Sequence, residues 1–255
     1  MENKVKRSLL LSTILGDGCL HRSGPAQRNK MGYISIKHGH KQKDYLEWKA
    51  KLLSLVKGDV VNVRPTKSYV KALDKTYDQY VIQFGMKRMR SWRRFCYPNN
   101  IKSFEKILPF INTPKLAAAL WLMDDGTGST GIAIKGTNIR VCTGFVLFLG
   151  TATKQDAESA QLWFKDTFNV TPRIRYQKVL YKSSERFYPE LRFTVQDSIT
   201  MWKNIKNIVK LIPSMSYKFK LLNDRANRND LLQPQTLVIK DLTSEDIVQK
   251  LCNIT

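Results

Sequence analysis

Two short acidic motifs, each placed directly after an apolar run, are the parts of this sequence best suited to chemistry. The first run leads into Gly-Asp-Gly at 16–18, and the second leads into Asp-Asp-Gly at 124–126. Asp125 follows Asp17 by 108 residues (125 minus 17), close to half of the 255-residue chain. Since a glycine directly after a helix is typical of a left-handed cap, we expect each helix to end there, with its acid at the C-terminus.

A carboxylate at a helix C-terminus has a specific chemical use. Unpaired carbonyl groups and the helix dipole place partial negative charge there, which disfavours a lone anion and favours a divalent cation. Mg²⁺ takes hard oxygen ligands and shares them with phosphate. If the two helices pack side by side, Asp17 and Asp125 meet and can bind metal ions between two phosphates. Ser12 and Gly16 are small enough for close packing, whereas Leu120, opposite Ser12, supports it less well.

The charge balance indicates a polyanionic partner. Lysine and arginine total 43 against 21 for aspartate and glutamate, a formal net charge of +22 at pH 7. A surface this basic repels itself, so an anionic partner is the natural reason to keep it. Nucleic acid is the most frequent such partner of a basic globular domain, although charge alone does not separate DNA from RNA.

Several other classes of protein are disfavoured by the same sequence. The 4 cysteines lie far apart with no CxxC pair, which argues against a zinc site and a disulfide scaffold. No apolar run reaches the roughly 18 residues needed to cross a bilayer, so no membrane partner is expected. The first apolar run resembles a signal peptide but lacks a small-residue cleavage pattern, and a similar run recurs mid-chain. We therefore interpret it as a structural helix.

The segments that follow the two motifs repeat in the same order. Each half reads as helix, strand, strand, helix, strand, strand, helix, which predicts an α+β fold of two pseudo-symmetric αββαββα halves. The halves are expected at 1–110 and 111–224, with Pro114 in the first turn of the second motif helix. Residues 225–255 are expected to be a tail with one short helix. Further helices are predicted over 44–56, 154–168 and 197–211, and strands over 31–38, 60–70, 77–85, 171–181 and 187–195.

Alternation along the predicted strands separates a buried face from a polar one. Near the last strand, Leu191 and Phe193 alternate with polar residues, which places the polar ones on the opposite face. Arginine, lysine and glutamine on such a face suit the base edges of a DNA major groove. The residues predicted to bind DNA in this way are Tyr33, Ser35, Lys37, Arg64, Gln79, Gln83, Arg173, Arg175, Gln177, Arg192 and Thr194.

The histidines of the first half are not expected to form a metal site, and a basic segment of that half has a different predicted role. His38 and His40 flank a glycine, which is more typical of a loop than of a metal site, and all 3 histidines lie in the first half. The basic segment near the end of that half is predicted to contact phosphates, so binding should weaken steeply with salt. Its arginines are Arg88, Arg90, Arg93 and Arg94.

The two motifs resemble the paired LAGLIDADG motifs of single-chain homing endonucleases, and the resemblance covers about residues 5–224. It implies a saddle whose antiparallel sheets lie in the DNA major groove, with the motif helices at the interface between halves. Asp17 and Asp125 match the metal-binding acids of the family. The preceding residues, Gly16 and Asp124, would add backbone carbonyl ligands. Leu120 departs from the small residue that the family prefers.

The resemblance also implies an activity and two further site residues. Segments similar to those carrying the family's basic residue nominate Lys102 and Lys218, which would offset charge in the transition state. The expected activity is a site-specific, staggered double-strand break in DNA during intron homing. It would proceed by hydrolysis with two or three Mg²⁺ ions shared between Asp17 and Asp125. The resemblance further implies a monomer in a mitochondrion or another organelle, with no targeting signal visible.

Two other functions remain open at this point. An intron maturase, which binds intron RNA and assists splicing, would share the fold and the basic surface. A splicing assay with an Asp17→Asn variant would distinguish it. A DNA-binding regulator on the same scaffold would be expected to lose one or both acids, and this chain keeps both.

Overall fold

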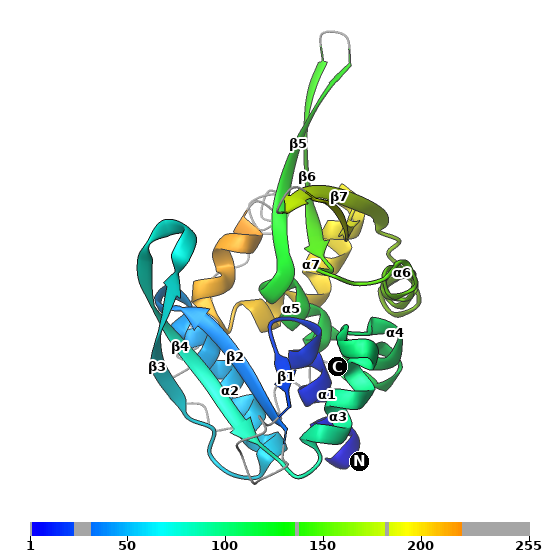
Figure 1. The fold of residues 1–255 in the computed structure, drawn as a ribbon. Coiled ribbons are helices and arrows are strands. Elements are labelled where there is room, and N and C mark those ends of the chain that lie inside the picture. Colours follow the sequence, from blue (N-terminus) through cyan, green and yellow to red (C-terminus); the bar gives the residue numbers. More distant parts are fainter. Residues whose placement is uncertain (1, 23–31, 136–137, 182–183, 221–255) are drawn as a thin grey trace.

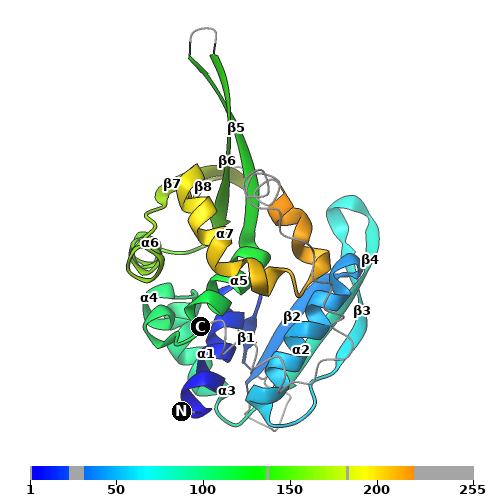
Figure 2. The same cartoon turned by 180° about the vertical axis from the view of Figure 1, so that it is seen from behind.

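Two helices run side by side through the middle of the molecule, with one sheet on either side of them (Figures 1 and 2). They are α1 (Glu2–Leu15) and α5 (Pro114–Asp125) in the computed structural model, which describes residues 2–22, 32–135, 138–181 and 184–220. Ser8 Oγ lies 2.8 Å from Thr113 Oγ1 near the start of α5, and Asp17 meets Asp124 near its end. The two motif helices are therefore parallel neighbours.

The first half of the chain forms a four-stranded antiparallel sheet with the strand order β1-β2-β4-β3. Helix α2 covers one face of this sheet (Figure 2). The elements are β1 (Cys19–His21), β2 (Tyr33–Gly39), η1 (His40–Gln42), α2 (Lys43–Lys57), β3 (Val63–Val70), η2 (Lys71–Leu73), β4 (Lys75–Gly85), α3 (Met89–Cys96), η3 (Pro98–Asn100), α4 (Phe104–Ile107) and η4 (Leu108–Phe110).

The second half repeats this plan with the strand order β5-β6-β8-β7. Strands β5 and β6 continue as a long hairpin that projects beyond the body of the molecule (Figure 1). The matching strand orders confirm the expected α+β fold of two pseudo-symmetric halves. The predicted tail at 225–255 lies outside the described residues. The elements are β5 (Gly126–Lys135), β6 (Asn138–Phe148), α6 (Lys154–Phe168), β7 (Arg173–Tyr181), β8 (Ser184–Arg192), α7 (Val195–Val209) and η5 (Pro213–Phe219).

The boundaries of the elements follow local side-chain chemistry. Helix α6 spans the predicted residues, because Thr153 and Asp156 form a capping box at its start. The last strand was predicted to reach 195, which is wrong, since β8 ends at Arg192. Thr194 instead accepts a hydrogen bond from the Asp197 backbone N–H at 3.1 Å and caps α7.

The glycines that follow the motif helices do not have the predicted left-handed conformation. Gly126 is extended, with φ −86° and ψ 155°, and the positive-φ glycines of the described chain are Gly58 and Gly150. A side chain at Gly18 would overlap the Thr13 carbonyl, and one at Gly126 would overlap the Leu122 carbonyl. Glycine is therefore required at both positions by close backbone approach.

The core confirms the close packing of the central helices. Ala117, Ala118 and Ala119 are fully buried, and so is Leu120, so the larger residue does not prevent burial of this stretch of α5. Both motif helices thus lie inside the molecule and hold their C-terminal ends in fixed positions. Within the described ranges, no helix is long and apolar enough to cross a membrane.

We predict that Gly126→Ala destabilises the fold by about 1–3 kcal/mol, because the added methyl group overlaps the Leu122 carbonyl. The matched control is Gly39→Ala. Gly39 has φ −68°, and an added Cβ there meets no atom within 4 Å, so this change should be neutral or slightly stabilising. Urea unfolding of both variants measures the difference. Equal stability of the two variants would show that close approach does not constrain Gly126.

Candidate active site

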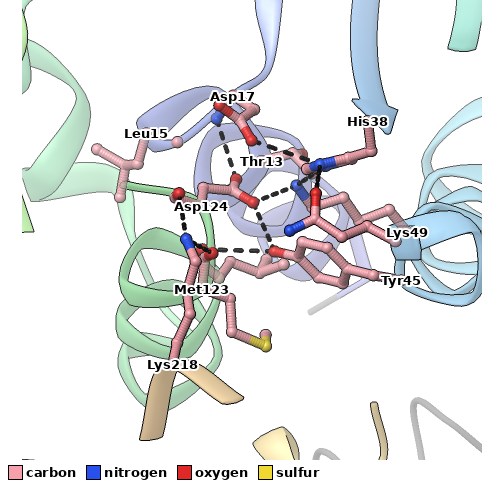
Figure 3. Close-up of polar contacts among 12 residues, drawn as sticks. Thr13, Leu15, Asp17, His38, Tyr45, Lys49, Met123, Asp124 and Lys218 are labelled. Atoms are coloured by element: carbon pink, nitrogen blue, oxygen red, sulfur yellow. Dashed lines mark hydrogen bonds and ion pairs between the residues drawn. The ribbon is translucent and has the colours of Figure 1, made fainter. Parts of the chain in front are cut away.

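The candidate site forms where the C-terminal ends of α1 and α5 meet (Figure 3). The backbone N–H of Asp17, in the turn after α1, donates a hydrogen bond of 3.0 Å to Asp124 Oδ2. Gly16 makes this possible, since any Cβ at that position would overlap the Asp124 side chain. The sequence prediction that the two motifs come together is therefore met, and the contact runs from backbone to carboxylate.

Three carboxyl groups share this region, and the pKa of two of them is raised. Burial, followed by the Asp124 charge, raises the pKa of Asp17. Burial also raises the pKa of Asp125 to about 7, with further contributions from the Asp124 and Asp17 charges. Negative charge is thus crowded at the junction of the two halves, and a hard divalent cation would relieve it.

Asp124 differs from its two neighbours because the first half of the chain neutralises it. Its side chain is fully buried, and Oδ1 accepts hydrogen bonds from Lys49 Nζ at 2.5 Å and Tyr45 Oη at 2.6 Å. Burial alone would raise the pKa of Asp124, but the Lys49 charge, His38 and the hydrogen bonds from Lys49 and Tyr45 together lower it. Asp124 is therefore ionised and held in place by α2.

His38 also lies in this cluster, so its interpretation as part of a loop was wrong. It occupies β2, is buried, and places Nε2 3.2 Å from Lys49 Nζ and 3.7 Å from Asp17 Oδ2. Burial and the Lys49 charge lower its pKa to about 4, so the ring is neutral near pH 7. Ligand atoms of Asp17, His38 and Asp124 all lie within 4.8 Å of one another.

Two lysines cap the motif helices in a pseudo-symmetric way. Lys102 Nζ donates to the carbonyls of Leu15 at 3.2 Å and Gly16 at 2.6 Å. Lys218 Nζ donates to the carbonyls of Met123 at 2.5 Å and Asp124 at 2.7 Å. Burial lowers the pKa of both lysines. The nominated lysines thus lie beside the acids, bonded to the carbonyls of Gly16 and Asp124 that were predicted as metal ligands.

An open pocket of about 450 Å³ lies on the second-half side of the site. It brings one predicted acid, Asp125, together with its predicted lysine, Lys218, and it opens beside the first residues of β5. The lining residues are Asp124, Asp125, Gly126, Thr127, Gly128, Phe148, Tyr217 and Lys218.

Comparison with known proteins decides the family. The sequence model of the LAGLIDADG DNA endonuclease family matches residues 7–198. The chain belongs to this family. Among solved structures, the LAGLIDADG chain is similar to the homing endonuclease I-WcaI bound to its DNA recognition sequence, with a TM-score of 0.62 and 19% identity, over 84% of this chain and 85% of that one. The LAGLIDADG meganuclease I-AabMI bound to uncleaved DNA matches with a TM-score of 0.49 and 14% identity, over 97% of both chains. No curated protein matches.

The polar residues predicted in the first sheet of this LAGLIDADG chain do share one face. Strand register places Ser35 opposite Gln83 and Lys37 opposite Val81, while Arg64 also faces Val81. Paired residues of neighbouring strands point to the same side, so the whole predicted set lies opposite the buried side chains of Ile34 and Ile36. The set consists of Tyr33, Ser35, Lys37, Arg64, Gln79 and Gln83.

The second sheet agrees with the prediction in part. Arg173, Arg175 and Gln177 are exposed at alternate positions of β7, as expected for one face. Arg192 faces Arg173 across the strands, and its Nε donates to Glu190 Oε1 at 2.5 Å. Thr194 belongs to a helix cap instead of a strand, so its predicted place on the sheet is wrong.

The basic segment of the first half forms α3, where three of its arginines are exposed. Arg93 is half-buried. Its guanidinium group donates to the Tyr97 carbonyl at 3.3 Å, and its Cζ lies 4.0 Å from the centre of the Tyr97 ring. Its position is therefore set by contacts inside the protein. The three exposed residues are Arg88, Arg90 and Arg94.

Sequence reasoning missed two residues of the site, although each left a signal. His38 continues the buried alternation of Ile34 and Ile36. Lys49 lies four residues after Tyr45 on the apolar face of α2, where a lysine is out of place. A charged or titratable residue in a buried pattern thus indicated a polar partner, but the pattern could not say which one.

We predict that Lys218→Met lowers the free energy of unfolding by about 1.5–3 kcal/mol, because the ammonium donates two charged hydrogen bonds to the end of α5. Lys220→Met is the control, since Lys220 is exposed and its loss should change stability by less than about 0.5 kcal/mol. Urea denaturation checks both. Indistinguishable unfolding of the two variants would mean that Lys218 does not stabilise the helix end.

Proposed function

We propose that this LAGLIDADG chain is a Mg²⁺-dependent endonuclease that makes a staggered double-strand break at a specific DNA site. The observation that carries the proposal is the joining of the two motifs at the ends of two pseudo-symmetric helices, where the Asp17 N–H donates to Asp124 Oδ2. Lys102 and Lys218 bond there to the carbonyls of Gly16 and Asp124. Two acid–lysine pairs provide one reaction centre for each strand. Because one chain supplies both pairs, the enzyme acts as a monomer.

The donor set fits Mg²⁺. Asp17 has a side chain that is 37% exposed, and Asp125 lines the open pocket, so both carboxylates can reach an ion and a phosphate. Burial and the charges of the neighbouring acids raise the pKa of each acid, and a bound cation would favour its ionised form. Asp124 is different, because its carboxylate is already bonded to Lys49 and Tyr45.

The residues of the chain divide the work of hydrolysis. Bound Mg²⁺ would supply activation of water and stabilisation of the leaving 3′ oxygen. Asp17 and Asp125 would hold the ions at the junction of the halves. Lys102 and Lys218 add positive charge where the pentacovalent phosphate develops negative charge. Among the described residues, both ammonium groups donate to backbone carbonyls, so each can exchange one hydrogen bond for a phosphate oxygen.

Double-stranded DNA is the proposed substrate. The I-WcaI structure with a similar fold holds its DNA recognition sequence, and the polar sheet faces of this chain carry the side chains that read base edges in a major groove. The net charge of +22 supplies the phosphate attraction. Intron homing and an organellar location rest on the family resemblance alone.

We predict that Asp17→Asn and Asp125→Asn each lower the rate of DNA cleavage by more than about 100-fold, because outer-shell partners of a metal already contribute up to that factor. Cut sites are first selected from a randomised duplex library with Mg²⁺, and rates are then measured on the selected site. Asp166→Asn, on the exposed face of α6, is the control and should cut normally. Normal cutting by either acid variant would refute the proposed centre.

DNA affinity should fall by about 1,000-fold or more between 50 and 200 mM salt, as expected when several phosphates are neutralised by lysine and arginine. Fluorescence anisotropy with the selected duplex, in the absence of Mg²⁺, measures this. A nearly flat dependence on salt would contradict binding of DNA along the basic sheet faces.

A further inference from the structure

Lys49 is the least expected charged residue of the described chain. It lies on the apolar face of α2 with a fully buried side chain. Taking an ammonium group out of water carries a desolvation penalty, which hydrogen-bond and charge partners held in place offset. The contacts of Lys49 therefore identify what it is for.

All the contacts of the ammonium group lead to the candidate active site (Figure 3). Nζ donates to Asp124 Oδ1 at 2.5 Å, lies 3.2 Å from His38 Nε2, and sits 4.3 Å from the centre of the Tyr45 ring. Since neutral His38 can donate from Nδ1 to Gln42 Oε1 at 3.1 Å, its Nε2 is left to accept from Lys49. The ammonium thus bonds to two of the three groups that cluster as metal-type ligands.

Asp124 passes this constraint to the opposite motif. Its Oδ1 is held by Lys49 and Tyr45, which leaves Oδ2 to accept the backbone N–H of Asp17 at 3.0 Å. One carboxylate thereby joins α2, α5 and the turn after α1. A change in the charge or position of Lys49 will move Asp124, and with it the backbone of Asp17.

The positions equivalent to Lys49 and Asp124, both within the described residues, do not repeat this arrangement. Helices α2 and α6 correspond with an offset of 111 residues (154 minus 43), which places Ala160 at the position of Lys49. The motif offset of 108 places Gly16 at the position of Asp124. The Lys49–Asp124 pair is therefore not repeated at the pseudo-symmetric positions, Ala160 and Gly16, and the two reaction centres differ in how they are built.

We propose that Lys49 is a positioning residue that acts as a resident cation of the site, fixing Asp17 through Asp124 and so serving one of the two reaction centres. This inference rests on the proposed function for its consequence in cleavage, but the positioning itself is independent of activity. In chemical terms, the Lys49 ammonium group lies among Asp17, His38 and Asp124, where a metal ion could otherwise bind.

The test compares Lys49→Met with Lys165→Met, an identical change on the exposed face of α6. Each DNA strand of the selected site is labelled separately, and single-turnover rates are measured with Mg²⁺ well below the melting temperature of each variant. We expect Lys49→Met to slow one strand by at least about tenfold more than the other, with nicked DNA accumulating. Lys165→Met should cut both strands normally. Equal rates on the two strands in Lys49→Met would overturn the proposal.

Hydrogen exchange of the Asp17 amide separates this inference from the proposed function. By NMR, the amide should exchange at least about tenfold faster in Lys49→Met than in the wild type or Lys165→Met. If the wild type cuts no DNA, the proposed function fails. The exchange rate of the Asp17 amide then tests the positioning role by itself. Unchanged protection would overturn that role.

Tyr45→Phe keeps the shape of the core and removes the other donor to Asp124 Oδ1. If Lys49→Met does not fold, the strand-specific cleavage rates and the exchange of the Asp17 amide are measured in Tyr45→Phe instead. We expect faster exchange of the Asp17 amide and unequal strand rates, with a smaller effect than for Lys49→Met. In that case, wild-type behaviour of Tyr45→Phe in both measurements would overturn the proposal.

Discussion

The close approach of the two motif helices is the constraint on which the rest of the molecule depends. It is possible because Gly16 has no side chain and leaves room for the Asp124 carboxylate. Small buried residues along α5 extend the same contact through the core. The outer sheets and capping lysines are arranged around this line, so the position of every proposed catalytic group follows from the packing of two helices.

The electrostatics of the junction depend on the different surroundings of its three carboxyl groups, Asp17, Asp124 and Asp125. Asp124 is buried with a lysine, whereas burial and the neighbouring acids raise the pKa of Asp17 and Asp125. A buried ion pair seldom adds net stability compared with apolar residues, but removing one member is costly. The pair is thus better understood as fixing a geometry, while the other two acids provide the capacity to hold metal ions.

Local patterns predicted the parts of the structure that local forces decide. Helix α6 was found because its capping box and apolar spacing agree, and the polar sheet faces followed from alternation. Thr194 was misplaced because a capping box continues the alternation of the strand before it. The conformation of Gly18 and Gly126 was predicted wrongly because a positive φ and a close backbone approach both select glycine, and the sequence does not distinguish them. Lys49 and His38 were missed because their partner, Asp124, comes from the other half of the chain.

The difference between Gly16 and Asp124 has a consequence for how such a chain can evolve. A duplicated module begins with two identical copies, each able to pair with itself. Two first halves joined in this geometry would set Gly16 against Gly16 and leave each Lys49 without its acid. Two second halves would set Asp124 against Asp124 with Ala160 where the cation is needed. Each half thus supplies what the other lacks at this contact, so replacing either half with a copy of the other would remove it.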